Sequence, residues 1–148
     1  MIKKVKRWLK RYLLAEIIGT ITAIGAASSV HYFLLNGFLS AYAGALGEFA
    51  GFYGTVFIQD YLLIKTGLKV EGKRVTYSNY FVLITNLILE FGPAGIIDGI
   101  IIRPFCMYLF PILLNDFKLG ILIGKITADV FFYILIIISN KIRKKYSK

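Results

Sequence analysis

The sequence predicts an all-α membrane protein, a polytopic bundle of four transmembrane helices built from a single domain that covers residues 1–148. Apolar residues make up 57% of the chain, above the roughly 45–50% of soluble domains, and a soluble fold of this length could not bury so much apolar surface. Four stretches exceed the roughly 20 residues that a helix needs to cross a bilayer. They cover residues 12–35, 38–64, 79–102 and 119–140.

The basic residues are concentrated outside these stretches. Six Lys and Arg precede the first stretch, four lie between residues 65 and 74, and five follow residue 140. Because cytoplasmic segments are enriched in Lys and Arg, all three groups predict a multi-pass protein of the cell membrane with cytoplasmic N- and C-termini. The net charge of +10 is attributed to basic segments that contact anionic lipid headgroups, and nucleic-acid binding is not expected.

The first stretch follows a basic region, as the apolar part of a signal peptide does, but it is longer than the 7–15 residues of such a region. We interpret it as a retained first helix. In the second stretch, glycines recur at spacings of three and four residues, from Gly44 to Gly54. Small residues four apart also occur in the first and fourth stretches, which predicts close helix packing. No internal repeat is apparent.

The third stretch is interrupted by Gly92-Pro93. Proline lacks an amide hydrogen and clashes with the preceding turn, so the third helix is predicted to be kinked or broken there. Apolar character continues to Leu114, and the region from residue 79 to 114 is either one kinked helix or two shorter pieces. The prolines at 104 and 111 predict a short outer cap between Arg103 and Lys118.

Six of the eight acidic residues fall within or at the edge of the apolar stretches. An ionised carboxylate at mid-membrane costs about 2.5–3.5 kcal/mol even on the mildest scale, so these groups need partners, water or protons. Distances from the ends of the stretches place Glu48, Glu90 and Asp129 in one layer near mid-membrane. Asn86 lies one turn before Glu90 on the same helix face. These four residues are the candidate transport or ion-binding site.

A second group of charges, Asp98, Arg103 and Lys125, is predicted to lie in the outer half of the membrane. Lys125 and Asp129 are four residues apart and can pair on one helix face. Asp98 and Arg103 are separated by about 140° on an ideal helix, so their pairing requires the long Arg side chain or a local distortion. Otherwise Asp98 meets Lys125 across helices.

On the inner side, Glu16 and Asp60 are placed where Arg11 or Lys65 can reach them. Two interpretations of the buried charges are open. They either form ion pairs that stabilise the bundle, or they include carboxylates that bind protons or cations during turnover. Acids outnumber bases six to two in this region, so pairing alone cannot neutralise it, which favours the second reading. The metal-binding residues, if a divalent cation is used, stay unknown at this point, and no other cofactor is expected.

The residues Ala15-Glu16-Ile17-Ile18-Gly19-Thr20 resemble the first-helix motif of small multidrug resistance transporters, which implies a membrane glutamate that exchanges protons for cations. The four-helix layout, the length and the charged loop resemble the GtrA-like family, which implies movement of lipid-linked sugars. An uncharacterised prokaryotic membrane family has fingerprints that three segments resemble, and this resemblance implies no activity. The segments are Glu90-Phe91-Gly92-Pro93-Ala94, Arg103-Pro104 and Gly124-Lys125 through Asp129.

The sequence contains no nucleotide-binding loop, metal-binding cluster of His and Cys, or nucleophile elbow. The leading hypothesis is therefore a small membrane transporter or flippase, expected to form a homo-oligomer, with proton- or cation-linked carboxylates. One alternative is a membrane-embedded enzyme acting on a lipid or lipid-linked substrate, with a divalent cation held by the carboxylates. The other alternative is a non-catalytic membrane subunit or scaffold.

Overall fold

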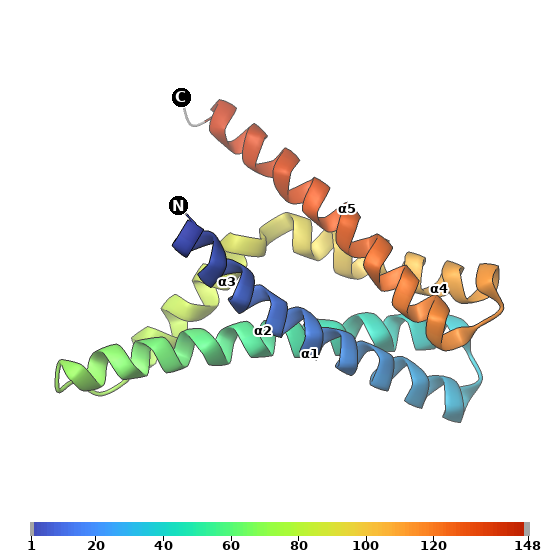
Figure 1. Ribbon diagram of the computed structural model, residues 1–148, viewed down its shortest axis with the longest axis horizontal. Coiled ribbons are helices and arrows are strands. Elements are labelled where there is room, and N and C mark those ends of the chain that lie inside the picture. Colours follow the sequence, from blue (N-terminus) through green and yellow to red (C-terminus); the bar gives the residue numbers. More distant parts are fainter. Residues whose placement is uncertain (1, 147–148) are drawn as a thin grey trace.

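The computed structural model describes the backbone of residues 2–146 and the side chains of residues 6, 10–89, 92–138, 141, 142 and 145. Every element in this part of the chain is a helix, which confirms the predicted all-α fold (Figure 1). The elements are α1 (Ile2–Leu34), α2 (Gly37–Val70), α3 (Tyr77–Ile97), the π-helical turn η1 (Asp98–Ile102), α4 (Arg103–Leu114) and α5 (Phe117–Tyr146).

Two helical hairpins with the same turn form most of the fold. In the first hairpin (α1 and α2), Leu35 is left-handed with φ 50°, and the Asn36 side chain accepts a 3.1 Å hydrogen bond from the amide three residues later. In the second hairpin (η1, α4 and α5), Asn115 has φ 51°, and Asp116 accepts the corresponding bond at 3.0 Å. In each, a left-handed residue ends one helix and a capping side chain begins the next.

The hairpins are an internal repeat with an offset of 80 residues. The ten positions from residue 41 and the ten from residue 121 have the same order of buried, half-buried and exposed side chains. A methyl group added at Gly44 would lie 3.1 Å from α1, and one added at Gly124 would lie 2.7 Å from α4. The missing side chain at each glycine therefore allows the first helix of the same hairpin to pack closely against the second. This likeness is not apparent in the residues, because it lies in turn chemistry and packing more than in residue identity.

The third predicted helix is broken at Gly92, where φ is 32° and ψ is −139°. Glycine accepts a positive φ readily, and Pro93 has no amide hydrogen with which to continue the helical bonds. The break divides the region into two pieces, as one of the two readings proposed. Tyr77–Leu89 is a short apolar helix, and Gly92–Leu114 is a segment long enough to cross a membrane.

The segment from Arg103 to Lys118, predicted as an outer cap that includes a short interfacial helix, contains the helix α4. This helix continues the second piece and belongs to the candidate span Gly92–Leu114. Pro104 lies in the first turn of α4, where a missing amide hydrogen is tolerated. The π-helical turn that precedes it absorbs the mismatch, since such turns change the hydrogen-bond register from four residues to five.

Three segments among the described residues are long and apolar enough to span a bilayer: Lys10–Leu34, Gly92–Leu114 and Phe117–Ile138. The predicted number of four spans is not confirmed. Although α2 is 34 residues long, its glycines and its two acids, Glu48 and Asp60, lower its apolar character. It lies along the other helices, and its own role as a span stays a prediction.

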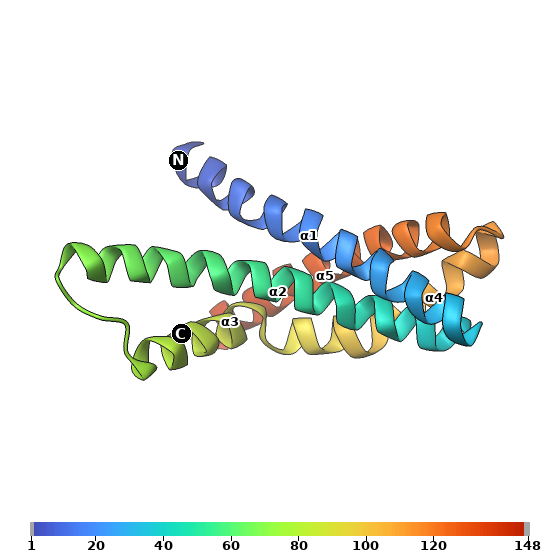
Figure 2. The same cartoon turned by 90° about the horizontal axis from the view of Figure 1, so that it is seen from below.

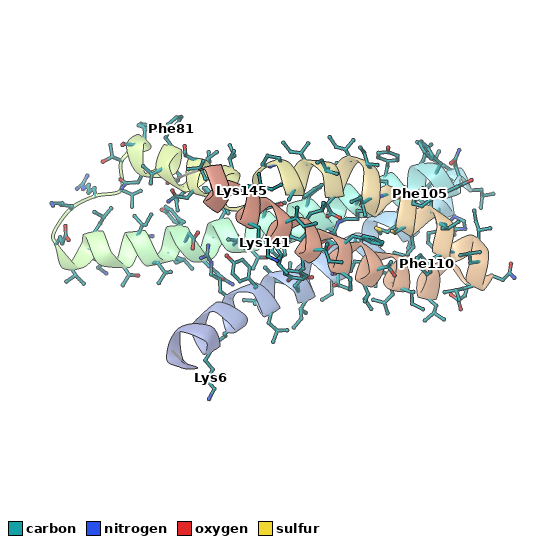
Figure 3. All side chains as sticks on the ribbon, turned by 90° about the horizontal axis from the view of Figure 1, so that it is seen from above. Lys6, Phe81, Phe105, Phe110, Lys141 and Lys145 are labelled. Carbon is teal, nitrogen blue, oxygen red and sulfur yellow. The ribbon has the colours of Figure 1, made fainter. Side chains whose placement is uncertain are left out.

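The molecule has a closely packed end and an open end. Both hairpin turns lie at the packed end, and α1, α2 and α5 diverge toward the other end, where the chain termini and the α2–α3 loop are found (Figures 1 and 2). Phe105 and Phe110 lie near the packed end, and Lys6 and Lys145 lie toward the open end (Figure 3). The three basic segments thus share one end, and the side of the membrane that this end faces stays a prediction.

Candidate functional site

Six charged side chains from five elements meet between the two hairpins, and we call them the charge network. They are Glu16 of α1, Glu48 of α2, Asp98 of η1, Arg103 of α4, and Lys125 and Asp129 of α5.

The turns explain why residues from different hairpins reach one level. Glu48 follows Asn36 by twelve residues, and Arg103 precedes Asn115 by twelve. At a rise of 1.5 Å per residue, both lie about 18 Å from the packed end, a distance similar to half the roughly 30 Å thickness of a bilayer's hydrocarbon core.

Arg103 joins three carboxylates from three elements. Its guanidinium donates to Asp98 Oδ2 at 2.7 and 2.9 Å, lies 2.9 Å from Asp129 Oδ1, and contacts Glu48 Oε1. The pair with Asp98 depends on the π-helical turn, in which the Arg103 amide bonds to the Asp98 carbonyl. This register places residues five apart above one another, and it is the local distortion that the sequence argument required.

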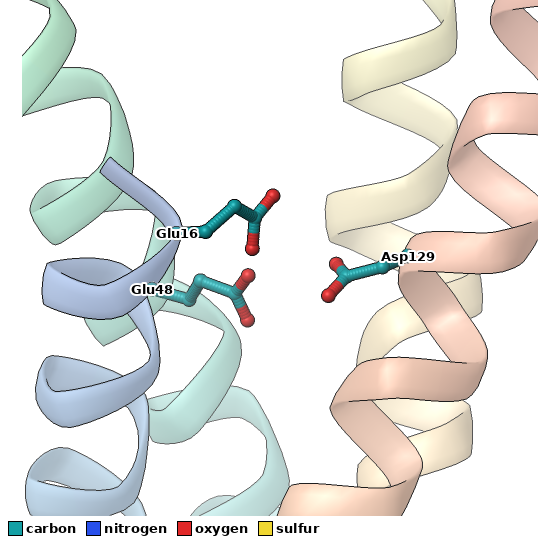
Figure 4. A group of neighbouring side chains, drawn as sticks. All are labelled: Glu16, Glu48 and Asp129. Carbon is teal, nitrogen blue, oxygen red and sulfur yellow. The ribbon is translucent and has the colours of Figure 1, made fainter. Parts of the chain in front are cut away.

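Lys125 lies among the other carboxylates. Its Nζ is 2.5 Å from Asp129 Oδ2, 2.7 Å from Glu16 Oε2 and 3.3 Å from Glu48 Oε1. One oxygen from each of these three acids lies within 4.8 Å of the others, and the three side chains point toward one another across the space between the hairpins (Figure 4). The ammonium group thus fills the position that a bound cation would take.

The charges are divided unequally between the hairpins. The first contributes two acids and no base to the network, a formal charge of −2. The second contributes two acids and two bases, a formal charge of 0. Each base has acidic partners in its own hairpin, Asp98 and Asp129 for Arg103 and Asp129 for Lys125. The acids of the first hairpin are paired only across the interface, as far as the described side chains show.

Three carboxylate oxygens of the network, Glu48 Oε2, Asp98 Oδ1 and Asp129 Oδ1, are buried and receive no hydrogen bond from any described side chain or backbone group. Asp129 Oδ1 still lies 2.9 Å from the Arg103 guanidinium, so Glu48 Oε2 and Asp98 Oδ1 are the two bare oxygens. The Glu48 and Asp98 residues are only 3% and 1% exposed. Both residues line a small cavity of about 20 Å³, together with Phe49 and Tyr53. This volume is sufficient for one water molecule, whose two hydrogens the bare oxygens could accept.

The structure brings Glu48 and Asp129 together, as the depth estimate placed them. The side chain of Glu90 lies outside those that the structure describes. Asn86 is exposed and does not belong to the network. Asp60 pairs with Arg11 at 2.7 Å, one of the inner-side contacts that the sequence allowed.

Two expectations about the remaining charges are corrected. Asp98, Arg103 and Lys125 do not form a separate outer cluster, because they join the same network as Glu48 and Asp129. The alternative contact of Asp98 with Lys125 is not formed, since the π-helical turn directs Asp98 to Arg103.

Glu16 was expected on the inner side with Arg11 or Lys65, but it belongs to the network through Lys125. The packing of α1 against α2 accounts for this contact, which the sequence alone does not place. Glu16 precedes Gly19 by three residues on one helix face, and a methyl group at Gly19 would lie 3.3 Å from the Glu48 side chain. The face of α1 that packs against α2 through Gly19 therefore also carries Glu16.

No family model, curated protein or solved structure matches this chain. The site is therefore interpreted from its own geometry.

Proposed function

We propose that this protein is a small membrane transporter or flippase in which carboxylates of the charge network take up and release protons or cations. The observation that carries the proposal is the division of charge. The first hairpin is bound to the second by two acids, Glu16 and Glu48, whose described cationic partners all belong to the second hairpin.

Separation of the hairpins would affect the two sides differently. Arg103 would keep Asp98, and Lys125 would keep Asp129, because these pairs lie within the second hairpin. The two glutamates would lose their partners, at about 5–7 kcal/mol together if both stayed ionised at mid-membrane. Protonation or cation binding removes this cost. Opening of the interface is thus linked to uptake of positive charge by the first hairpin.

The shape of the bundle supports access to this layer from the open end. The side chain of Glu16 is 26% exposed and that of Glu48 is 5% exposed, and both line the small cavity. Because the helices diverge toward the open end (Figures 1 and 2), Glu16 is the first carboxylate of the charge network that an incoming proton or cation would meet. Glu48 is the second.

The test needs no knowledge of the cargo. Proteoliposomes are adsorbed on a solid-supported membrane and exposed to a rapid step to lower pH, and the transient charge movement is recorded. The wild type should give a transient, and Glu16→Gln combined with Glu48→Gln should abolish it. Asp60→Asn is the matched control, since Asp60 pairs with Arg11 outside the network. Equal transients from the wild type and the double variant, or none from the wild type, would overturn the proposal.

One observation favours a second candidate, a metal-dependent membrane enzyme that acts on a lipid. The three oxygens of Glu16, Glu48 and Asp129 are close enough to share a divalent cation. In this arrangement Lys125 lies at the same position and would have to leave. Calorimetric titration of the wild type with Mg²⁺ tests this candidate: the absence of saturable heat would exclude it, and saturable heat that is lost in Asp129→Asn would place the cation among the three carboxylates.

A further inference from the structure

An apolar groove of about 400 Å³ runs beside α2 at the level of the break in α3. This volume lies within the range of pockets that bind small organic molecules. The groove exists because the chain changes direction at Gly92, so the two pieces of α3 do not pack along α2 as one straight helix would. Its walls are formed by Phe49, Tyr53, Ile84, Leu87, Ile88, Gly92, Gly95, Ile96 and Ile100.

The groove adjoins the charge network. Phe49 and Tyr53 line both the groove and the small cavity that contains the bare oxygens of Glu48 and Asp98. Their rings stack with centroids 5.3 Å apart. The Phe49 ring also rests on Gly99, where an added methyl group would overlap it. Two aromatic side chains thus form the partition between an apolar space and a pair of buried carboxylates.

The partition itself carries one neutral polar group, the Tyr53 hydroxyl, and the charged groups of the adjoining cavity are carboxylates and Arg103. Arg103 Nη1 makes no hydrogen bond with a described group but contacts Glu48 Oε1. Glu48 Oε2 and Asp98 Oδ1 receive no hydrogen bond from the described residues. Pro93 cannot donate to the carbonyl of Leu89, because it has no amide hydrogen. The neighbouring bases are already engaged, Arg103 by three carboxylates and Lys125 by three. A complementary ligand must therefore supply donors or positive charge, whereas a phosphate or carboxylate would meet bare acceptors.

We propose that the groove and the adjoining cavity form a binding site for a cationic amphiphile, an alkyl amine whose chain lies in the groove and whose ammonium group reaches Glu48 and Asp98. The inference rests on the proposed function and deepens it, because it assigns the class of cargo. The ammonium group would pass the partition by displacement of the Phe49 ring. It would neutralise Glu48, so amine binding and protonation exclude each other at this carboxylate.

The experiment uses the full chain in phosphatidylcholine nanodiscs and a photoreactive dodecylamine. Labelled residues are mapped by mass spectrometry after irradiation. The label is expected on the groove residues of α2 and α3, and excess dodecylamine should remove it. Dodecanol and dodecanoate have the same chain without the positive charge and should compete at least about tenfold less well, as expected for loss of a charge-assisted hydrogen bond. Equal competition by all three would identify a general furrow for lipid chains and overturn the proposal.

Two substitutions of the same kind locate the site. Ile88→Trp fills the groove at an exposed position, and Ile126→Trp is the matched control on a lipid-facing position of α5 outside it. Labelling should fall about tenfold in the first variant and stay unchanged in the second. Glu48→Gln should weaken dodecylamine competition but leave dodecanol competition unchanged. If Ile88→Trp and Ile126→Trp label alike, the site is not the groove.

Failure here can be separated from failure of the proposed function. If the wild type gives charge transients on a pH step but binds dodecylamine no better than dodecanol, proton-linked transport stays supported. The proposed class of cargo is then excluded. If the wild type shows neither property, both the proposed function and the proposed class of cargo are excluded. Glu48→Gln that folds, labels as the wild type does and lacks transients would show that the carboxylate serves proton uptake alone, which overturns the proposed contact with the amine.

Discussion

The two hairpins have the same backbone plan and opposite electrostatic roles. At the offset of 80 residues, Arg103 stands where the first hairpin has Ala23, and Lys125 stands where it has Ala45. Both alanines are buried in close helix contacts. The second hairpin thus carries the cations at positions where the first carries small packing residues. A repeated fold provides the interface, and the differences within the repeat provide its chemistry.

The largest effect is expected when the second hairpin loses its guanidinium. Arg103→Met removes a cation from among Glu48, Asp98 and Asp129 and leaves bare carboxylates in a buried layer. Breaking a buried ion pair in this way costs about 3–5 kcal/mol. Unfolding in mild detergent, followed by circular dichroism, should show this loss of stability.

The same change becomes less damaging if the acids are removed with the base. Arg103→Met combined with Glu48→Gln and Asp98→Asn should recover most of the loss, because the two most buried carboxylates that Arg103 compensates are then neutral, and Asp129 keeps its pair with Lys125. If the single variant is as stable as the wild type, the guanidinium does not join the hairpins.

A smaller effect is expected at the second cation. Lys125→Met should lower the free energy of unfolding by about 2–4 kcal/mol, less than the Arg103 change. Arg103 still contacts Glu48 and Asp129 in this variant, and Glu16 is partly exposed. The same detergent unfolding measurement gives the comparison.

Lys125→Met also leaves three carboxylate oxygens without their central cation. Added Mn²⁺ should therefore raise the melting temperature of this variant and have little effect on the wild type. An equal shift in both proteins would mean that Lys125 does not occupy the cation position.

The sequence is sufficient to predict the helices and the break at Gly92, because apolar length and proline chemistry act locally. It is not sufficient to predict that Glu16 lies at the same level as Glu48 and Asp129. A depth estimated from residue number assumes that each helix runs straight across the membrane. Nor does the sequence reveal the π-helical turn that pairs Asp98 with Arg103. The repeat is hidden because a lipid-facing position only requires an apolar side chain, so sequence identity is lost while turns and glycine contacts persist.

The two repeats also differ at a position before the second hairpin. Gly92 corresponds to Tyr12, which lies in the regular helix α1. Gly92→Ala should destabilise the protein by about 1–3 kcal/mol, because alanine at φ 32° and ψ −139° is strained. The free energy of unfolding should fall, whereas Gly25→Ala on an exposed face of α1 should raise it slightly. A stable Gly92→Ala variant would mean that the break does not need a glycine.

The smallest expected effects are at the two turns, where the hairpins should behave alike. Asn36→Ala and Asp116→Ala each remove one capping bond to an amide three residues later. Each should cost about 1 kcal/mol, and both bonds are solvent-exposed, so neither variant gains a buried unpaired group. Their free energies of unfolding, measured in the same detergent, should agree within about 0.5 kcal/mol and should add in the double variant. A large cost at one turn alone would show that the turns are similar in shape but not in energy, and the comparison of the hairpins would then rest on their packing.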